Sequence, residues 1–251
     1  MNKYYHYLIA ALLFFASCKT AQQPATPQPV TLSFVDYRIT PESKVDSSFL
    51  IFLKPYGDSV NRTMNKVIGF ATIAMYKKQP ESVLGNFMAE AMLIMAEEKF
   101  KTKVHASFVN YGGIRSHIPK GDVTVGNIFE IMPFDNLVVL QQMNGKTLQQ
   151  FLDLVANRGG WPCAGITYQL QNKKAINILV DGKQLDENAV YTIANSDYVA
   201  NGGDDAFMLK VIKPQNLGYI FRDALIEYTN RLTKQGKPVN GSLTNRVTNA
   251  N

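Results

Sequence analysis

The chain has 251 residues, of which 46% are hydrophobic, and this content is enough for one sizeable core or for one domain with a tail. The formal net charge is +6, but the basic residues are dispersed along the chain. This dispersion favours a solvated basic surface over a groove for a nucleic-acid polymer, because such a groove needs basic residues clustered on one face. A basic surface still favours small anionic ligands such as nucleotides.

Residues 1–18 have the pattern of a signal peptide. Lys3 supplies the positive charge, and the apolar run Leu8–Phe15 is too short to span a bilayer as a helix. The small residues directly before Cys18 resemble the lipobox of bacterial lipoproteins, in which the cysteine is lipidated and becomes the new N-terminus. We therefore expect an exported, lipid-anchored protein of the bacterial cell envelope, at the periplasmic or outer-membrane face. The alternative is an ordinary secretory signal with a chance cysteine.

Three further segments follow the signal peptide. Residues 19–30 are rich in Pro and Gln and predict an extended linker. Residues 31–236 predict one folded domain, and residues 237–251 a polar, frayed tail. Besides Cys18 the chain has only Cys163, so we expect no intramolecular disulfide and a buried, unreactive Cys163.

The first half of the domain contains one strongly periodic helix. Apolar residues recur at three- and four-residue spacing over Ser82–Lys101, which predicts a helix with one buried face. Other elements are expected at Thr31–Thr40 (a strand), Asp46–Lys66 (a helix capped by Ser47 and Ser48, and kinked or split at Pro55), Val67–Tyr76 (a strand) and His105–Val109 (a buried strand).

Hairpins dominate the second half. A short helix capped by Thr124 is expected within Asp122–Glu130, and Asn144-Gly145 is a turn signal. Other expected elements are strands at Leu137–Gln142, Ile166–Leu170, Ile176–Val180 (followed by a turn at Asp181-Gly182) and Val190–Asn195, and helices at Thr147–Ala156 and Leu217–Leu232. Helices gathered early and hairpins late predict an α+β, or mixed α/β, domain.

Two glycines mark the first candidate binding segment. Gly112 and Gly113 follow a buried strand and let the backbone turn tightly beside a ligand. Asn110 precedes them, and Arg115 offers a planar fork of donors to an anion or to a polar ring edge. Alone, this segment is equally well a surface turn with a solvated arginine.

Two later loops have the same character. Phe134 and Tyr198 could clamp a flat ring, and stacking on a nucleobase contributes about 1–3 kcal/mol. Asp204 could accept hydrogen bonds from two adjacent ribose hydroxyls, and Asn136 offers an amide to a base edge. The third loop also supplies the candidate binding residues Asn201 and Gly203.

These loops resemble the C-terminal domain of the 5′-nucleotidase family, the type that includes periplasmic UDP-sugar hydrolases and ecto-5′-nucleotidases. The resemblance runs from about Phe34 to Leu232. Its most specific parts are Ser82-Val-Leu-Gly-Asn86, Asn110-Tyr-Gly-Gly-Ile-Arg115, Met132-Pro-Phe-Asp-Asn136, Ala164-Gly-Ile-Thr-Tyr168 and Asn195-Ser-Asp-Tyr-Val-Ala-Asn-Gly-Gly-Asp204.

The resemblance implies a layered sandwich of sheets and helices that binds the nucleoside part of a substrate. It implies that Phe134 and Tyr198 stack on the base. It also implies that Arg115 and Asn136 contact the nucleotide and that Asp204 holds the ribose.

Two positions depart from the family pattern. An arginine is usual shortly before the segment that starts at Ser82. Here Lys77 or Lys78 stands in that region, and lysine lacks the bidentate fork of arginine. Tyr111 stands where the family often has glycine.

The sequence lacks the motifs of a dimetal centre. Members of the family that hydrolyse phosphate esters carry two metal ions in a separate N-terminal metallophosphatase domain, and two metals need many His, Asp and Asn ligands. After the signal peptide this chain has only His105 and His117, and no Asp-x-His or Gly-His-x-His motif. We therefore expect no catalytic residue, metal or other cofactor on this chain, and divalent metals on a separate partner.

The expected function is that of a nucleotide- or nucleoside-binding component of a 5′-nucleotidase-type hydrolase in nucleotide catabolism. Its ligand would be a nucleoside or nucleoside monophosphate, and its partner a metallophosphatase lipoprotein. Two alternatives remain open: a non-catalytic cell-surface lipoprotein that binds nucleosides, and a degenerate structural domain without a ligand.

Overall fold

The computed structural model describes residues 32–250 of the chain. The expected signal peptide with Cys18, and the linker at residues 19–30, lie outside the described residues. The chain divides into two units, residues 1–47 and 48–251. In the first unit, residues 32–46 are exposed and form no helix or strand. The strand expected at Thr31–Thr40 is therefore wrong over its described part, because alternation alone makes no strand where no second strand pairs with it.

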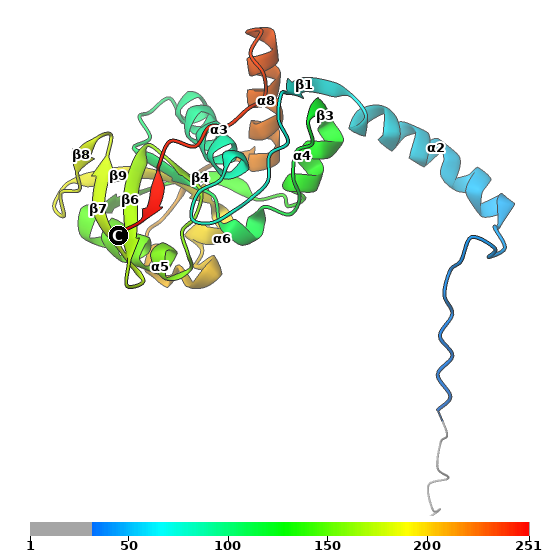
Figure 1. The fold of residues 1–251 in the computed structure, drawn as a ribbon, viewed down its shortest axis with the longest axis horizontal. Helices are drawn as coiled ribbons and strands as arrows, with labels where there is room; N and C mark the ends of the chain where they lie inside the picture. The colour runs from blue at the N-terminus through cyan, green and yellow to red at the C-terminus, as the bar shows by residue number, and fades with distance from the viewer. Residues whose placement is uncertain (1–31, 251) are drawn as a thin grey trace, which may run out of the picture. The chain divides into compact units, whose positions relative to one another are not determined.

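A five-stranded sheet lies at the centre of the second unit (Figure 1). The strand order is β10-β4-β9-β2-β5, in which β2 and β9 are parallel and the other neighbours are antiparallel. The strands are β2 (Ala106–Phe108), β4 (Leu137–Asn144), β5 (Cys163–Ala164), β9 (Val190–Ser196) and β10 (Gln215–Ile220).

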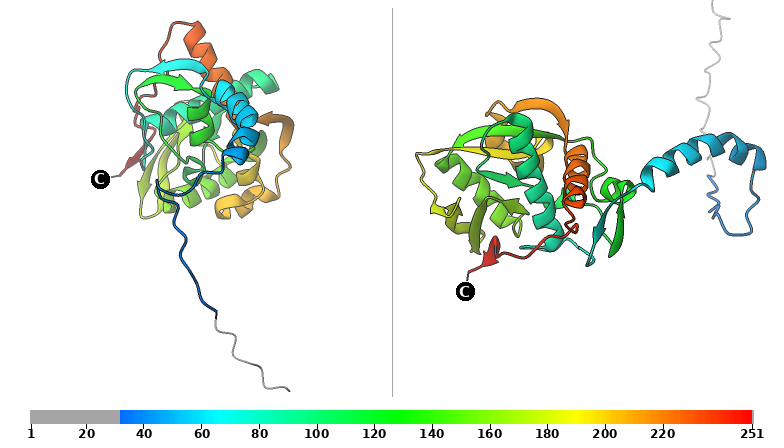
Figure 2. Two further views of the ribbon diagram at one scale, coloured as in Figure 1. Left: turned by 90° about the vertical axis from the view of Figure 1, so that its right-hand side faces the viewer. Right: turned by 90° about the horizontal axis from the view of Figure 1, so that it is seen from above.

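Each face of this sheet carries its own apolar core, because successive side chains of a strand point to opposite faces. Leu140 and Ala194 belong to the core between the sheet and a first group of three helices, α3 (Val83–Phe100), α4 (Val125–Ile131) and α8 (Phe221–Lys234). These helices lie side by side in Figures 1 and 2. Met143 and Ile193 belong to the core on the other face.

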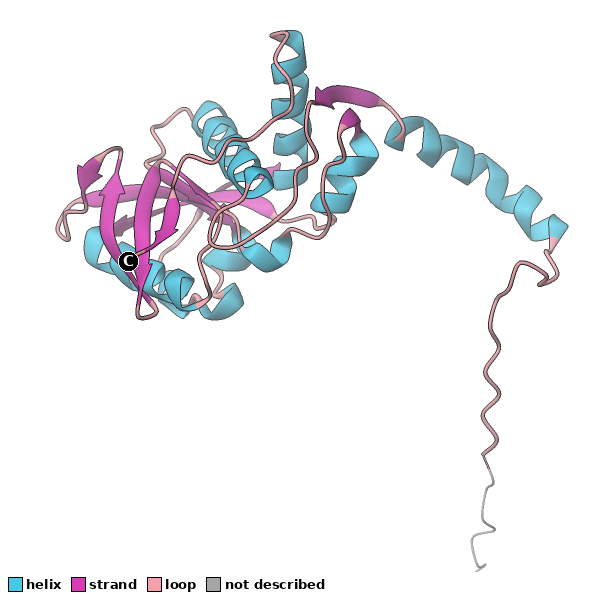
Figure 3. Cartoon of the chain, in the orientation of Figure 1, coloured by secondary structure: helices cyan, strands magenta, loops and turns pink. Residues whose placement is uncertain are grey.

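The second core is closed by a helix and a smaller sheet. Helix α5 (Gly145–Asn157) packs between the central sheet and a four-stranded sheet of order β11-β6-β7-β8. The strands of this sheet are β6 (Ile166–Gln171), β7 (Lys174–Val180), β8 (Lys183–Gln184) and β11 (Val247–Asn249). Helices and sheets therefore alternate in layers, as Figure 3 shows, and the predicted mixed α/β sandwich is confirmed.

Capping side chains fix where the helices begin. Thr124 accepts a hydrogen bond from Asn127 N at the start of α4, as predicted, and Ser82 accepts one from Gly85 N at the start of α3. Asn144 caps α5 in the same way, so the Asn144-Gly145 signal marks a junction between strand and helix.

The N-terminal edge of the second unit contains a long helix and a two-stranded ribbon. Helix α2 (Ser47–Met64) continues through Pro55, so of the two expectations for this proline, a kink or a split, the split is wrong. Strand β1 (Val67–Ala71) pairs with β3 (Gly121–Thr124) and is shorter than the strand predicted to reach Tyr76. No helix among residues 32–250 is both long and apolar enough to cross a membrane.

Two expectations about the C-terminal region are also wrong. The segment Leu217–Leu232 is not one helix, because strand β10 runs to Ile220 before α8 begins. The tail is not frayed in its described part, since β11 pairs with β6 and Glu81 holds the backbone before it. The Glu81 carboxylate accepts hydrogen bonds from the backbone N–H groups of Thr244, Asn245 and Arg246.

Candidate functional site

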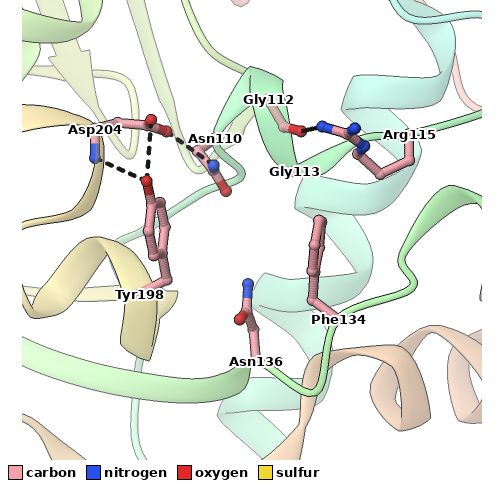
Figure 4. A pocket seen from close by; sticks show the side chains of 8 residues that line it. All are labelled: Asn110, Gly112, Gly113, Arg115, Phe134, Asn136, Tyr198 and Asp204. Atoms are coloured by element: carbon pink, nitrogen blue, oxygen red, sulfur yellow. Dashed lines mark hydrogen bonds between the residues drawn. The ribbon is translucent and has the colours of Figure 1, made fainter. Parts of the chain in front are cut away.

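A cavity of about 340 Å³ lies where three loops meet at one end of the central sheet. This volume is within the range of small-molecule sites. Its lining includes eight of the ten binding residues that the sequence predicts (Figure 4): Asn110, Gly112, Gly113, Arg115, Phe134, Asn136, Tyr198 and Asp204.

The first loop leaves strand β2. The backbone closes a short 3₁₀ turn, Tyr111–Gly113, in which Gly113 N donates to Asn110 O at 2.9 Å. A Cβ on Gly113 would lie 2.7 Å from Asn110 Oδ1, so only glycine leaves the Asn110 amide in its place. The side chain of Asn110 can therefore face the cavity only if residue 113 is glycine.

Arg115 lies at the opposite end of this loop. Its backbone N–H donates to Ile131 O at 3.0 Å, and its guanidinium donates to Gly112 O at 3.3 Å. The guanidinium carbon is 5.9 Å from the centroid of the Phe134 ring. Arg115 is exposed, so its remaining donors are available to an anionic group at the mouth of the cavity.

The second loop, between α4 and β4, is fixed by contacts with the first residues of helix α8. Arg222 donates to Phe134 O at 3.2 Å and forms an ion pair with Asp135, while Phe221 N donates to Asn136 O at 2.8 Å. These contacts fix the backbone on both sides of the Phe134 ring. Sequence reasoning missed Arg222. The sequence feature that could have indicated it is an arginine among the apolar residues of a helical pattern. In the structure Arg222 is only 8% exposed.

The third loop begins at the short helix α6 (Asp197–Ala200), capped by Ser196. Asp197 Oδ1 accepts from Leu137 N at 3.0 Å, which ties this helix to the start of β4. Tyr198 Oη is 3.3 Å from both the backbone N and Oδ1 of Asp204. The tyrosine and the carboxylate are thus held as one unit.

The two aromatic rings face the cavity from opposite sides. In Figure 4 Tyr198 and Phe134 stand on its two walls, and Asn136 lies between them at the base. Both rings are partly exposed, at 46% for Tyr198 and 39% for Phe134. A planar ring that entered between them would cover apolar surface on both of its faces, while Asn136 could bond to its edge.

Two predicted residues do not line the cavity. Asn201 is exposed and ends α6, with its backbone N–H bonded to Asp197 O. Gly203 lies against the Tyr198 ring, and a Cβ there would be 2.5 Å from Tyr198 Cε1. Gly203 therefore contributes by leaving room for the ring.

Lys77 and His117 lie beside the cavity. Lys77 Nζ donates to Ile114 O at 2.7 Å and is 4.5 Å from the centroid of the Tyr111 ring. His117 is exposed and stacks on Tyr76 with ring centroids 4.7 Å apart. Neither residue lines the cavity, so Lys77 supports the first loop from outside.

Metal-binding groups do not gather in the described part of the chain. Within residues 32–250 no three His, Cys, Asp or Glu side chains are placed to hold a metal ion. His105 does not line the cavity. Its Nδ1 accepts a hydrogen bond from Thr192 N at 2.9 Å near the start of strand β9, and the third cavity loop follows the other end of that strand. The described residues around the cavity therefore do not supply the ligand set that a dimetal centre needs.

The layered fold and the three-loop cavity define a ligand-binding domain, and comparison with known proteins gives its class. The family described as "5′-nucleotidase, C-terminal domain" matches residues 61–211, and this chain belongs to that family.

Characterised relatives are much longer than this chain. It is 29% identical over 217 residues to the trifunctional nucleotide phosphoesterase protein YfkN of Bacillus subtilis, covering 78% of this chain and 14% of that protein. It is 29% identical to the 5′-nucleotidase of Vibrio cholerae, covering 66% of this chain and 31% of the relative. The structure of a 5′-nucleotidase precursor from Thermus thermophilus superposes with a TM-score of 0.70 at 26% identity, over 85% of this chain and 45% of that one.

Proposed function

We propose that this chain is the nucleoside-binding component of a 5′-nucleotidase-type hydrolase, and that a separate metallophosphatase chain supplies two divalent metals. The ligand is a nucleoside or nucleoside monophosphate. The observation that carries the proposal is the pairing of Phe134 and Tyr198 across a cavity that also contains the Asp204 carboxylate.

The cavity has a matching group for each part of a nucleoside monophosphate. The two rings take the base, and Asn136 takes a base edge. Asp204 accepts from ribose hydroxyls, since a carboxylate is a charged, acceptor-only group. Arg115, at the exposed side, attracts the phosphate and leaves it facing outward. An outward phosphate is accessible to a metal centre on a second chain.

The division of labour follows from the lining of the cavity. Among the described residues that line it there is one carboxylate and no histidine, cysteine or serine, so a Ser–His or Cys–His pair cannot form there. Hydrolysis would therefore depend on chemistry that the partner brings.

Export and lipid anchoring through Cys18 would place the complex at the bacterial cell envelope. The linker of residues 19–30 would hold the binding domain away from the membrane. Mass spectrometry of the mature protein tests this part, with a lipid-modified Cys18 at its N-terminus as the expected result.

The function itself is tested by binding and turnover measured separately. Titration calorimetry of the single chain should show binding of adenosine and AMP. AMP hydrolysis with Mn²⁺ or Mg²⁺ should require addition of a metallophosphatase chain. Turnover by the highly purified single chain would contradict the division of labour. Nucleoside binding with no activating partner would indicate a non-catalytic binding protein, and absence of binding would indicate a structural domain.

A further inference from the structure

We propose that Arg158, which lies outside the cavity, is the positioning residue that holds the Asp204 carboxylate in its binding conformation. It acts through the neighbouring Asp205, with which it forms an ion pair. The inference rests on the proposed function and adds to it a residue at the end of helix α5 on which recognition of the ribose depends.

Asp204 and Asp205 share an unusual backbone conformation. Their φ angles are positive, 50° at Asp204 and 61° at Asp205, and thus lie in the left-handed region that favours glycine. Aspartate tolerates this region better than most residues, but it remains less favourable there than glycine. Strained backbone of this kind persists at binding sites when tertiary contacts hold it. The contacts around the two aspartates therefore determine whether the segment keeps its shape.

Tertiary contacts fix this segment at both of its ends. Gly203, before the aspartates, lies against the Tyr198 ring, and Ala206, after them, is completely buried in the second core. Ala206 N donates to Gly203 O at 3.1 Å, which closes the turn. The Asp204 side chain is bonded to Asn110 and Tyr198, as Figure 4 shows. The remaining residue of the turn is held from elsewhere in the chain.

The partner of Asp205 is Arg158, which caps the C-terminal end of helix α5. The ion pair joins Arg158 Nη2 to Asp205 Oδ2. Helix α5 and Ala206 both contribute to the second core, so this ion pair lies at the edge of a packed region. Asp205 is therefore attached to a helix that the core already holds in place.

The backbone of Arg158 is itself fixed. Gln79 Nε2 donates to Arg158 O at 2.6 Å and to Gly160 O at 2.8 Å. Gly160 N in turn donates to Val155 O, within helix α5, at 3.0 Å. A charged group that projects from a fixed backbone restricts its partner to few positions.

These contacts give Arg158 a role that an ordinary surface ion pair lacks. Without it, Asp205 is free to return to a negative φ, and this rotation moves Asp204 because a peptide bond joins the two residues. The Asp204 carboxylate then no longer meets the ribose hydroxyls. Neither Arg158 nor Asp205 lines the cavity, so the effect of Arg158 should appear as a selective loss of hydroxyl recognition.

The first test replaces Arg158 with methionine in the full chain and measures nucleoside binding by titration calorimetry. We expect Arg158→Met to bind adenosine about fivefold more weakly, the upper end of what one exposed ion pair contributes. Binding of 2′,3′-dideoxyadenosine, which lacks both hydroxyls, should be unchanged. Arg231→Met is the matched control, because Arg231 also forms an ion pair and its side chain is 41% exposed, against 35% for Arg158. It should leave both affinities at the wild-type value.

A second substitution separates backbone conformation from charge. Glycine adopts a positive φ without strain, whereas alanine does not. In the Arg158→Met background, Asp205→Gly should therefore restore most of the adenosine affinity, and Asp205→Ala should not. Both substitutions remove the same charge, so the backbone preference of residue 205 is what distinguishes them.

Amide hydrogen exchange reports the same conformation without a ligand. The Ala206 N–H bonds to Gly203 O across the two aspartates, so its exchange measures how often the turn opens. We expect faster exchange in Arg158→Met. The additional Asp205→Gly substitution should slow it again, because glycine needs no ion pair to keep a positive φ.

The possible results separate this inference from the proposed function. Adenosine binding that Arg158→Met leaves unchanged, or an equal loss for both nucleosides, would overturn the inference and leave the function standing. Rescue by Asp205→Ala that is as complete as rescue by Asp205→Gly would also overturn it, because the unpaired charge would then explain the loss. If the wild type binds no nucleoside, the function fails, and the exchange of the Ala206 N–H decides whether Arg158 fixes the turn.

Discussion

Asn110 Nδ2 donates a hydrogen bond to Asp204 Oδ2 at 2.9 Å, although the two residues are 94 positions apart in the chain. The bond joins the loop after β2 to the loop after β9. It fixes one oxygen of the carboxylate and leaves the other, Oδ1, within 3.3 Å of Tyr198 Oη. A ligand that enters the cavity would therefore meet a carboxylate whose orientation is already set.

The Asp204 carboxylate should be the group that accepts hydrogen bonds from the ribose hydroxyls of the ligand. We expect Asp204→Asn to bind adenosine about 1.5–3 kcal/mol more weakly, because hydrogen bonds to a charged acceptor are lost. Binding of 2′,3′-dideoxyadenosine, which lacks both hydroxyls, should change much less. Titration calorimetry with both ligands checks this. An equal loss for the two ligands would mean that Asp204 acts on the fold of the loop.

The aromatic rings should contribute through stacking. Phe134→Ala and Tyr198→Ala are each expected to weaken adenosine binding by about 1–3 kcal/mol. Phe207→Ala is the matched control, since Phe207 is exposed and does not line the cavity. Unchanged affinity in both cavity variants would place the base elsewhere.

Gly203 offers a test of the same ring without removing it. A Cβ at Gly203 would be 2.5 Å from Tyr198 Cε1, so Gly203→Ala must displace the ring. We expect adenosine affinity to fall by on the order of 1 kcal/mol, as a partial loss of one stacking contact. Gly57→Ala serves as the control, because nothing lies within 4 Å of a Cβ there. Wild-type affinity for Gly203→Ala would show that Tyr198 does not contact the ligand.

Arg222 should hold the Phe134 loop in place. Arg222→Met keeps the aliphatic stem but removes the donors to Phe134 O and Asp135, so we expect stability and adenosine affinity each to fall by about 1–3 kcal/mol. Arg231→Met, which removes an exposed ion pair with Glu98 from the same helix, should cost less stability and leave binding unchanged. Denaturant unfolding and calorimetry measure the two effects. A stability loss for Arg222→Met with intact binding would limit its role to folding.

Cys163 should make the domain less stable at alkaline pH. Burial raises the pKa of its thiol from 9.0 to about 12, so the unfolded chain releases this proton at a lower pH than the folded chain does. The corresponding stability is fully present below pH 9 and is lost as the pH rises toward 12, by roughly 1 kcal/mol between pH 9 and 10. In Cys163→Ala the decrease over that interval should be smaller. Identical slopes in the two proteins would show that the thiol does not titrate this way.

The sequence predicts those helices and strands whose stability comes from residues within the same segment, through apolar spacing and capping side chains. Helix α3 was predictable because its apolar period and its Ser82 cap agree. The junction of β10 and α8 was not, because Leu217 and Tyr219 suit a half-buried strand as well as a helix. The ordered tail was also unpredictable. Its backbone is held by Glu81, which lies more than 160 positions earlier and gives no local signal.

In the candidate site, too, some residues are predictable from the sequence and others are not. Its lining residues come from loop motifs that the sequence shows directly, and the structure brings eight of the ten together. Two supporting residues outside the lining, Gly203 and Arg222, have roles that depend on packing. Gly203 acts through the space it leaves for Tyr198, and Arg222 acts from a helix that contributes nothing to the lining. Such support is determined by tertiary contacts, which a single sequence does not reveal.

The paired tail has a practical consequence for how the protein can be handled. Strand β11 covers the outer edge of β6, and Arg246 beside it bonds to Cys163 O and to Glu90. Deleting the chain after Gly236 would uncover that edge, and an unpaired strand edge is a template for aggregation. Recombinant forms should therefore keep residues 237–250, with any affinity tag placed beyond them on a flexible spacer.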